Sequence, residues 1–414
     1  MSKFLLNIKF YLFITLIIAM YCCAHKVKHG NSKMTYSKTE EEQTIKEILP
    51  GAYQLDQYLS LLRGKKVGLV INQTSVIGNR QLLDTLLELN VAVKKVFVPE
   101  HGFRGEASAG AHISDEKDNK TGLPIKSLYG KNKKPSVSDL ADLDVVVFDL
   151  QDVGVRFYTY ISTLHYVMEA CAENNKQLIL LDRPNPNGFY VDGPVLDTHF
   201  KSFVGMHPIP VVYGLTIAEL CRMIHGEKWI KSNLNWMPKV ILCKNYNHRS
   251  RYELPVKPSP NLPNTRAVVL YPGLCFFEGT VVSLGRGTDA PFQLFGHPLW
   301  PKADTSFIPK ERVGAKNPPW KDKVCFGKSL LNLDLNSVYF EKKIRLNELL
   351  EAYRVLGKST DFFSNPKFFD QLAGTDDLRI QIVQGKSEKV IRQSWQKKLA
   401  DYKKLRSKYL LYAD

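Results

Sequence analysis

Short apolar runs alternate with amphipathic segments along the first half of the chain. Four runs are rich in apolar residues and are predicted to be strands: 65–71, 93–99, 143–150 and 176–182. Three segments repeat apolar residues at three- and four-residue steps and are predicted to be helices: 80–90, 162–175 and 215–226. Apolar strands that alternate with helices are typical of a parallel sheet covered on both faces. The fold class is therefore predicted to be α/β.

Capping residues place the ends of these helices. The helix over 162–175 is predicted to begin at a Ser/Thr cap, and the helix over 215–226 to begin at Thr216 and end at Gly226. Near the C-terminus, apolar residues recur at helical spacing: Ile391, Trp395, Leu399, Tyr402 and Leu405. They predict an amphipathic helix whose other, lysine-rich face is solvated.

A proline-rich segment divides the chain into two regions. Residues 255–264 contain four prolines, which is typical of a crossing between domains. Beyond them the pattern is less regular and richer in aromatic residues. We therefore place a first domain at 48–250 and a second domain at 251–414.

The first 23 residues have the pattern of an export signal. Two lysines precede an apolar run over 10–24, which is too short to span a membrane comfortably. The run contains Cys22 and Cys23, so a lipoprotein anchor, a signal cleaved without lipid and an uncleaved membrane anchor all stay open. Residues 24–47 are polar and are predicted to be a tether. We expect export to the periplasm or attachment to a membrane as a lipoprotein.

Charge and cysteine content narrow the choice of partners. The net charge of +16 favours nucleic acid, an anionic membrane or a cell-wall polymer as partner, and export argues against nucleic acid.

The five cysteines beyond the signal include no CxxC pair and no Cys/His cluster. They are predicted to be mostly buried thiols, with one disulfide left open, rather than a zinc site.

Polar side chains follow every predicted strand. In an open parallel sheet, ligands bind in the crevice beyond the carboxyl ends of the strands. The residues at these positions are Asn72 and Gln73; Glu100, His101 and Arg104; Gln151, Asp152, Arg156, Tyr158 and Tyr160; and Asp182, Arg183 and Asn185. Neighbouring strands thus deliver carboxylates, amides, guanidiniums and phenols to one predicted pocket.

Several chemistries lack their motifs in this chain. No GxGxxG follows the first strand, and GxxxxGK[ST], GxSxG and HExxH are absent. No second histidine lies at ligand spacing from His101, so neither a metal nor a cofactor is predicted. The remaining carboxylates, amides and aromatic hydroxyls suit carbohydrate, because they bond sugar hydroxyls, stack on sugar rings and supply acid and base groups for an acetal.

A second polar cluster lies at 276–298. Its glycine-rich loop, 278–288, carries Glu278 and Arg286 between glycines that permit close backbone approach. We predict that this loop contacts the ligand. The alternative is a purely structural loop.

Long strings of the sequence resemble one known family: "NQTS", "PEHGFRG", "FDLQDVGVRFYTYISTL", "DRPNPNG", "EGTVVSLGRGTDAPF" and "FDQLAGTDDLR". From about residue 48 onward the chain resembles the NamZ-like exo-β-N-acetylmuramidases, first catalogued as a bacterial domain of unknown function. The resemblance implies a Rossmann-like N-terminal domain without a nucleotide, a smaller C-terminal α/β domain that closes the cleft, and no cofactor. It also implies release of β-linked N-acetylmuramic acid (MurNAc) from the non-reducing end of peptidoglycan-derived saccharides such as MurNAc-GlcNAc.

The resemblance assigns the catalytic glutamate to Glu100. We expect this residue to act as general acid on the glycosidic oxygen, in a pocket lined by Phe97, Phe103 and Phe157 that favours its protonated form. The alternative is an ion pair between Glu100 and Arg104.

The second catalytic carboxylate is expected to be Asp152, with Asp182 as the second choice. A retaining mechanism, an inverting mechanism and a substrate-assisted course through the N-acetyl group all stay open, because the sequence gives no distance between carboxylates. The loop 278–288 is expected to close one end of the pocket, as an exo-acting enzyme requires.

Further residues are expected to bind the sugar. Arg156, Arg183 and Arg286 are candidates for the lactyl carboxylate of MurNAc, because a guanidinium binds a carboxylate through two hydrogen bonds; a structural ion pair is the alternative for each. Tyr158 and Tyr160 either line the sugar site or pack in the core. The other expected contacts are Asn72, Gln73, His101, Arg104, Gln151, Asn185 and Glu278.

Two rival functions stay open. A murein-binding lipoprotein of the same fold would keep the sugar contacts without catalysis. An amidase or esterase would need a metal or a Ser/His pair, and neither is visible in the sequence. The presence of Glu100, Asp152 and Asp182 together favours the glycosidase.

Overall fold

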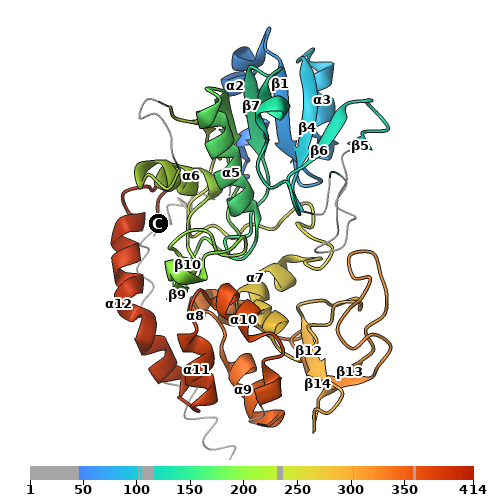
Figure 1. Ribbon diagram of the computed structural model, residues 1–414, viewed down its shortest axis with the longest axis vertical. Helices are drawn as coiled ribbons and strands as arrows, with labels where there is room; N and C mark the ends of the chain where they lie inside the picture. Colours follow the sequence, from blue (N-terminus) through green and yellow to red (C-terminus); the bar gives the residue numbers. More distant parts are fainter. Residues whose placement is uncertain (1–45, 101–102, 104–115, 231–235, 302, 358–359) are drawn as a thin grey trace, which may run out of the picture. The chain divides into compact units, whose positions relative to one another are not determined.

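The computed structural model describes residues 46–100, 103, 116–230, 236–301, 303–357 and 360–414. The chain divides into two units, Met1–Lys46 and Glu47–Asp414, and the fold below is that of the second unit (Figure 1). The predicted signal and nearly all of the predicted tether lie outside the described residues. Within the described residues, no helix combines the length and the apolar character needed to span a membrane.

A seven-stranded sheet forms the centre of the N-terminal region. In spatial order its strands are β11 (Lys239–Ile241), β8 (Gln177–Leu181), β7 (Val145–Asp149), β1 (Val67–Ile71), β4 (Val93–Val98), β6 (Pro124–Ser127) and β5 (Glu116–Lys117). All neighbouring pairs are parallel except β5 and β6. The predicted parallel α/β fold is confirmed.

Helices cover both faces of this sheet, as its apolar strands require. One face packs against α2 (Leu55–Leu62) and α3 (Leu82–Glu88), and the other against α4 (Val137–Leu140), α5 (Tyr160–Glu173) and α6 (Ile217–Gly226). Successive side chains of a strand point to opposite faces. Val145 and Val147 of β7 therefore join the core with α2 and α3, whereas Val146 and Phe148 join the core with α5 and α6.

The predicted start is confirmed for α6, whereas α5 starts earlier than predicted, after Thr159, whose side chain makes no capping bond. The Thr216 hydroxyl accepts a hydrogen bond from the Glu219 amide, and the Glu219 carboxylate accepts one from the Thr216 amide, which confirms the predicted start of α6. Helix α5 begins at Tyr160, two residues before Ser162. The Ser162 hydroxyl donates instead to the Phe203 carbonyl at 2.8 Å, because this side chain faces another segment rather than the helix end.

The C-terminal region is mainly helical and carries a small antiparallel sheet. The sheet has the order β12 (Leu294–His297), β14 (Cys325–Ser329) and β13 (Thr305–Phe307). The helices are α7 (Thr265–Leu274), α8 (Leu335–Glu341), α9 (Asn347–Val355), α10 (Pro366–Ala373), α11 (Asp377–Val383) and α12 (Glu388–Arg406). The predicted C-terminal amphipathic helix is confirmed as α12, which buries Ile391, Trp395, Leu399 and Tyr402.

Short elements complete the chain. They are the hairpins β2 (Val76–Ile77) with β3 (Arg80–Gln81) and β9 (Asp192–Val195) with β10 (Pro210–Val212), and the 3-10 turns η1 (Gly51–Tyr53), η2 (Thr198–Phe200), η3 (Cys275–Gly279) and η4 (Thr360–Phe362).

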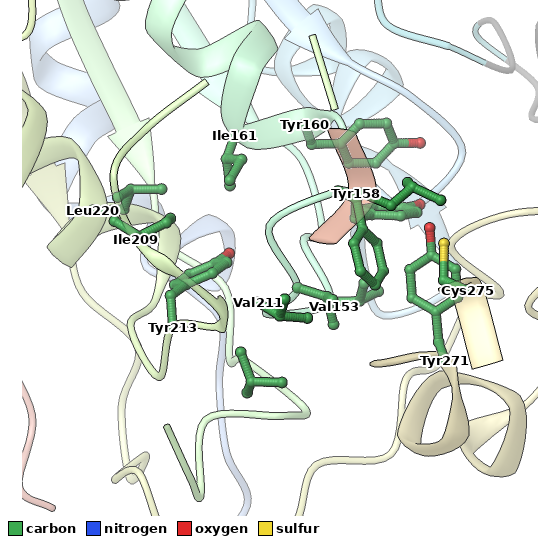
Figure 2. Packing of buried hydrophobic residues seen from close by; sticks show 14 of the residues in the cluster. Val153, Tyr158, Tyr160, Ile161, Ile209, Val211, Tyr213, Leu220, Tyr271 and Cys275 are labelled. Carbon is green, nitrogen blue, oxygen red and sulfur yellow. The ribbon is translucent and has the colours of Figure 1, made fainter. Parts of the chain in front are cut away.

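One apolar core joins the two regions. It contains side chains of α5 and α6 together with those of α7, α9, α10 and α12. Figure 2 shows Tyr158 from the first region beside Tyr271 and Cys275 from the second. Residues 47–414 therefore form one compact unit, and the domain boundary at 250/251 stays a prediction.

The cysteines are part of this packing. Cys171, Cys221, Cys243, Cys275 and Cys325 are free and buried. The prediction of buried thiols is confirmed, and the one disulfide left open does not form among these residues.

Candidate active site

The strand order locates the crevice of the sheet. Numbered along the chain, the six parallel strands have the spatial order 6-5-4-1-2-3, so the order reverses between β1 and β7. The loops that follow these two strands are joined by a hydrogen bond, in which the backbone N–H of Gln151 donates to the Thr74 hydroxyl at 3.2 Å. These two loops thus contact each other at the switch point, and the residues of the sheet side that line the pocket follow β4, β6 and β7.

This pocket has a volume of about 330 Å³. Both regions of the chain line it, among others with Glu100, Tyr129, Phe157, Tyr158, Thr159 and Phe203 from the first and Ser259, Asn261, Tyr271, Cys275, Glu278, Arg286 and Phe292 from the second. Its size lies at the small end of ordinary ligand pockets. Three of the residues labelled in Figure 2 belong both to the apolar core and to the lining of this pocket: Tyr158, Tyr271 and Cys275.

Glu100 follows β4 directly and lines the pocket. Its carboxylate accepts a hydrogen bond from the Thr159 hydroxyl at 3.3 Å and is within hydrogen-bonding reach of the Tyr129 hydroxyl. Burial, and then the charge of Glu100, raise the pKa of Tyr129, so the phenol keeps its proton and donates. Of the three expected phenylalanines, only Phe157 lines the pocket, whereas Phe97 and Phe103 are buried in the two sheet cores.

Arg286 and Glu278 stand in the same pocket as an ion pair. The Glu278 carboxylate contacts one terminal nitrogen (Nη2) of Arg286, and the guanidinium lies 5.2 Å from the centre of the Phe292 ring. Burial lowers the pKa of Arg286, but the Glu278 carboxylate outweighs this effect and raises it, so the guanidinium stays charged. The predicted ligand-facing loop 278–288 therefore does reach the pocket.

The two aspartates expected as second catalytic carboxylate do not line the pocket. Asp152 accepts hydrogen bonds from the Gly154 amide at 2.6 Å and from the Tyr213 hydroxyl. Burial raises its pKa to about 6. Asp182 accepts bonds from the Ala218 amide at 3.0 Å and the Tyr412 hydroxyl at 2.6 Å. Both carboxyl groups thus hold segments of the fold together.

Two of the three candidate arginines are likewise engaged inside the protein. The Arg156 guanidinium is fully buried and donates to the carbonyls of Pro194, Ile209 and Leu372, and burial lowers its pKa to about 9. Arg183 forms a buried two-point ion pair with Asp149 at 2.5 and 2.8 Å. Neither guanidinium has its donors directed to the pocket, which leaves Arg286 as the candidate that lines it.

Most of the expected amide contacts are also internal. All four donate from the side-chain amide nitrogen. Asn72 donates to the Tyr160 hydroxyl at 2.7 Å, and the other three donate to backbone carbonyls. These bonds join Gln73 to Pro258 at 3.1 Å, Gln151 to Pro184 at 2.7 Å and Asn185 to Leu215 at 2.8 Å. Tyr158 lines the pocket and also donates to the Pro258 carbonyl at 2.8 Å. These bonds hold the strand-end loops in place around the pocket, and His101 and Arg104 lie outside the described residues.

Gly154 shows why these loops tolerate little change. Its φ angle is +76°, and a Cβ atom there would lie 2.0 Å from the Asn185 side-chain oxygen. Glycine is the residue that combines this backbone conformation with so close a neighbour.

Sequence reasoning missed several lining residues. Tyr129 follows β6, one of the strands of the sheet that the sequence pattern did not predict, and Thr159 lies just before α5. Ser259, Asn261 and Tyr271 lie in or beyond the proline-rich segment, which carried no ligand signal of its own. Among the described residues, no group of three or more His, Cys, Asp or Glu side chains could hold a metal ion.

Asp182 gives a prediction about stability and pH. Burial raises its pKa to about 7, compared with about 3.9 in an unfolded chain. The native state therefore favours the protonated acid. The protonated acid therefore contributes its full stabilisation below about pH 4, and this contribution is lost as the pH rises to about 7. Because the two pKa values differ by about three units, the free energy of unfolding falls by roughly 4 kcal/mol at most over this range.

We expect Asp182→Asn to flatten this part of the stability profile, because the amide cannot ionise. Urea unfolding at pH 5 and pH 8 measures the change, with Asp56→Asn on the exposed face of α2 as control. An equal fall in the free energy of unfolding for wild type and Asp182→Asn would contradict the assignment.

Comparison with known proteins identifies the family. The model of the N-terminal domain of the exo-β-N-acetylmuramidase NamZ matches residues 67–266, and the model of its C-terminal domain matches residues 269–412. The chain belongs to the NamZ family of exo-β-N-acetylmuramidases. The peptidoglycan β-N-acetylmuramidase NamZ of Bacillus subtilis (strain 168) is 36% identical to it over 402 residues, which cover 92% of this chain and 94% of that protein.

Two solved structures share the fold. Both are DUF1343 family proteins from Bacteroides fragilis NCTC 9343. One has 45% identity and a TM-score of 0.82, covering 89% of this chain and 100% of that one. The other has 31% identity and a TM-score of 0.74, covering 88% and 99%. The NamZ assignment thus extends over nearly the whole described fold.

Proposed function

We propose that this member of the NamZ family is an exo-acting glycoside hydrolase that releases β-linked MurNAc from the non-reducing end of peptidoglycan fragments. One observation carries the proposal: Glu100 and the Arg286–Glu278 pair line the same pocket. A proton donor for the glycosidic oxygen and a cation for the lactyl carboxylate thus stand around one sugar-sized space. Membership of the family disfavours the non-catalytic murein-binding lipoprotein.

In this proposal Glu100 gives its proton to the glycosidic oxygen as the bond to the anomeric carbon breaks. The leaving sugar then departs as a neutral alcohol rather than as an alkoxide. Thr159 and Tyr129 direct the carboxyl group and donate hydrogen bonds to the carboxylate that remains. Donors that bind the charged product of proton transfer stabilise the transition state more than the ground state.

The substrate is recognised through its charge. MurNAc differs from GlcNAc by a lactyl ether that ends in a carboxylate, and Arg286 is the candidate guanidinium that lines the pocket. Glu278 contacts the guanidinium through Nη2, and we assign the remaining donors of Arg286 to the lactyl group. The Phe292 ring beneath the guanidinium keeps its plane in position.

The decisive experiment uses aryl β-glycosides of MurNAc and of GlcNAc with the purified chain. Much faster release of the aryl group from the MurNAc glycoside than from the GlcNAc glycoside is the expected result. Release from neither glycoside by the folded protein would refute the proposal.

Tyr129→Phe tests the positioning of Glu100. Loss of one hydrogen bond to a charged group costs about 1.5–3 kcal/mol, so we expect kcat to fall by roughly 10- to 100-fold with little change in KM.

Tyr166→Phe is the matched control for Tyr129→Phe. Both tyrosine rings contact Phe203: the distance between ring centres is 6.4 Å for Tyr166 and 6.1 Å for Tyr129. Tyr166, however, does not line the pocket. Equal losses in the two variants would show that aromatic packing, not the bond to Glu100, is responsible.

Export is part of the same proposal, because peptidoglycan lies outside the cytoplasmic membrane. The lysines, the apolar run and the cysteines in residues 1–23 support it. We expect the mature chain to begin near Cys22 or Cys23. Mass spectrometry of the protein made from the full-length gene checks this, and a chain that retains Met1 would contradict a cleaved signal.

A further inference from the structure

A second pocket, of about 340 Å³, lies at the C-terminal end of α12 and shares no lining residue with the active site. Four segments distant in sequence form it. They contribute Phe189 and Tyr190, His248 and Arg249, Lys342, and Lys403 with Arg406. The active-site chemistry uses none of these residues.

Positive charge is in excess in this pocket. Four cationic side chains line it, with Asp414 as the one carboxylate among the lining residues described. The Arg406 guanidinium binds the Asp414 carboxylate at 2.6 and 2.8 Å, and the charge of Arg249 also acts on Asp414. Arg249, Lys342 and Lys403 are exposed. Three cations around one concavity attract a ligand that carries more than one negative group.

The dipole of α12 explains only part of this charge. Cations in the last turn of a helix complement its C-terminal dipole, which accounts for Lys403 and Arg406. Lys342 lies at the end of α8, and Arg249 lies in the loop after β11. Tertiary structure therefore brings together cations that helix stability does not require.

An aromatic wall lies beside these cations. Phe189 and Tyr190 line the pocket, and the centres of their rings are 4.7 Å apart. His248 also lines it, but its Nε2 donates to the Glu219 carboxylate at 3.0 Å and its Nδ1 is buried, so the imidazole is not used to bind the ligand. A ligand that carries carboxylates on a partly apolar chain fits cations beside an aromatic wall, whereas inorganic phosphate has no apolar part to cover that wall.

We infer that this pocket is a second, non-catalytic binding site for the carboxylate-bearing peptide stem of peptidoglycan. The choice of peptidoglycan as the source rests on the proposed function, whereas the anion site itself does not. Carboxylates of the stem bind Arg249, Lys342 and Lys403, and the aromatic wall of Phe189 and Tyr190 packs against the aliphatic part of the stem. Such a site holds the polymer while the other pocket removes its terminal sugar.

The test measures binding of the free stem tetrapeptide, prepared from sacculi with an amidase, to the full mature chain by calorimetry. The variant Arg249→Gln/Lys342→Gln/Lys403→Gln removes three charges from the pocket. The control Lys389→Gln/Lys397→Gln/Lys398→Gln removes three charges from exposed positions of α12 outside it. Inorganic phosphate is titrated in parallel.

We expect wild type and control to bind the tetrapeptide alike, with affinity that falls as salt rises, and the pocket variant to bind at least tenfold more weakly. All three proteins should cleave the aryl MurNAc glycoside equally. Equal binding by the pocket variant, equal weakening in the control, no binding by wild type, or tighter binding of phosphate would each overturn the inference. Failure of the proposed function can be told apart from failure of this inference, because in that case the wild-type protein does not cleave the MurNAc glycoside.

Discussion

Glu100→Gln is expected to lower kcat on the natural disaccharide MurNAc-GlcNAc by about 10³-fold, within the range of general acid catalysis. Glutamine keeps the size of the side chain and its bond from Thr159, but it has no proton of suitable acidity to give. KM should change little, since Arg286, to which we assign the lactyl contact, also lines the pocket and is untouched.

The leaving group decides between the roles of Glu100. A sugar alcohol needs a proton to depart, whereas an activated phenol, such as dinitrophenol, departs without one. If Glu100 is the acid, Glu100→Gln retains much of its rate on a dinitrophenyl β-MurNAc glycoside. If Glu100 acts as nucleophile or base, both substrates lose rate equally. Wild-type activity of the variant on the disaccharide would remove Glu100 from the chemistry altogether.

Arg286→Gln is expected to abolish the preference for MurNAc. Breaking a hydrogen-bonded charge pair costs about 2–5 kcal/mol, which corresponds to a fall of roughly 30- to 5,000-fold in kcat/KM for the MurNAc glycoside. The low rate on the GlcNAc glycoside should stay constant, because that sugar has no carboxylate. The ratio of the two kcat/KM values is therefore the measurement.

Arg312→Gln is the matched control. Arg312 also lies in the C-terminal region and pairs with a carboxylate, that of Asp289, but it is exposed and outside the pocket. We expect this variant to keep the wild-type ratio. An unchanged ratio in Arg286→Gln would show that the lactyl group is recognised elsewhere.

The carboxylates show where local sequence stops being informative. Glu100, Asp152 and Asp182 all follow apolar strands and are equivalent by pattern. Only Glu100 faces open space, because the loops after β7 and β8 turn their carboxyl groups toward Tyr213 and Tyr412. Tyr412 is 230 residues away from Asp182, and no local pattern predicts such a partner.

The three candidate arginines also look alike in the sequence, but each has different partners in the structure. Arg156 binds three carbonyls, Arg183 binds Asp149, and Arg286 lines the pocket. Each has the same donors, and the sequence does not show which acceptors the fold places beside them. An ion pair, the alternative considered for all three, is formed by Arg183 with Asp149 and by Arg286 with Glu278. Among the described residues, Arg156 binds carbonyls and no carboxylate.

The sequence by itself determined the parallel α/β sheet, the start of α6 and the amphipathic face of α12. These features depend on the periodicity of apolar residues and on bonds within one turn of helix, which lie within a few residues of each other. The long family strings likewise pointed to the function.

Tertiary structure alone decided which polar residues surround the pocket. The loops after β1 and β7 bond each other through Gln151 and Thr74 and through Asn72 and Tyr160. The pocket is open where Tyr129 and Thr159 meet Glu100. Tertiary structure also brought Arg249, Lys342 and Lys403 to one second pocket. Such contacts join residues tens to hundreds of positions apart, and their geometry follows from how whole elements pack rather than from any local pattern.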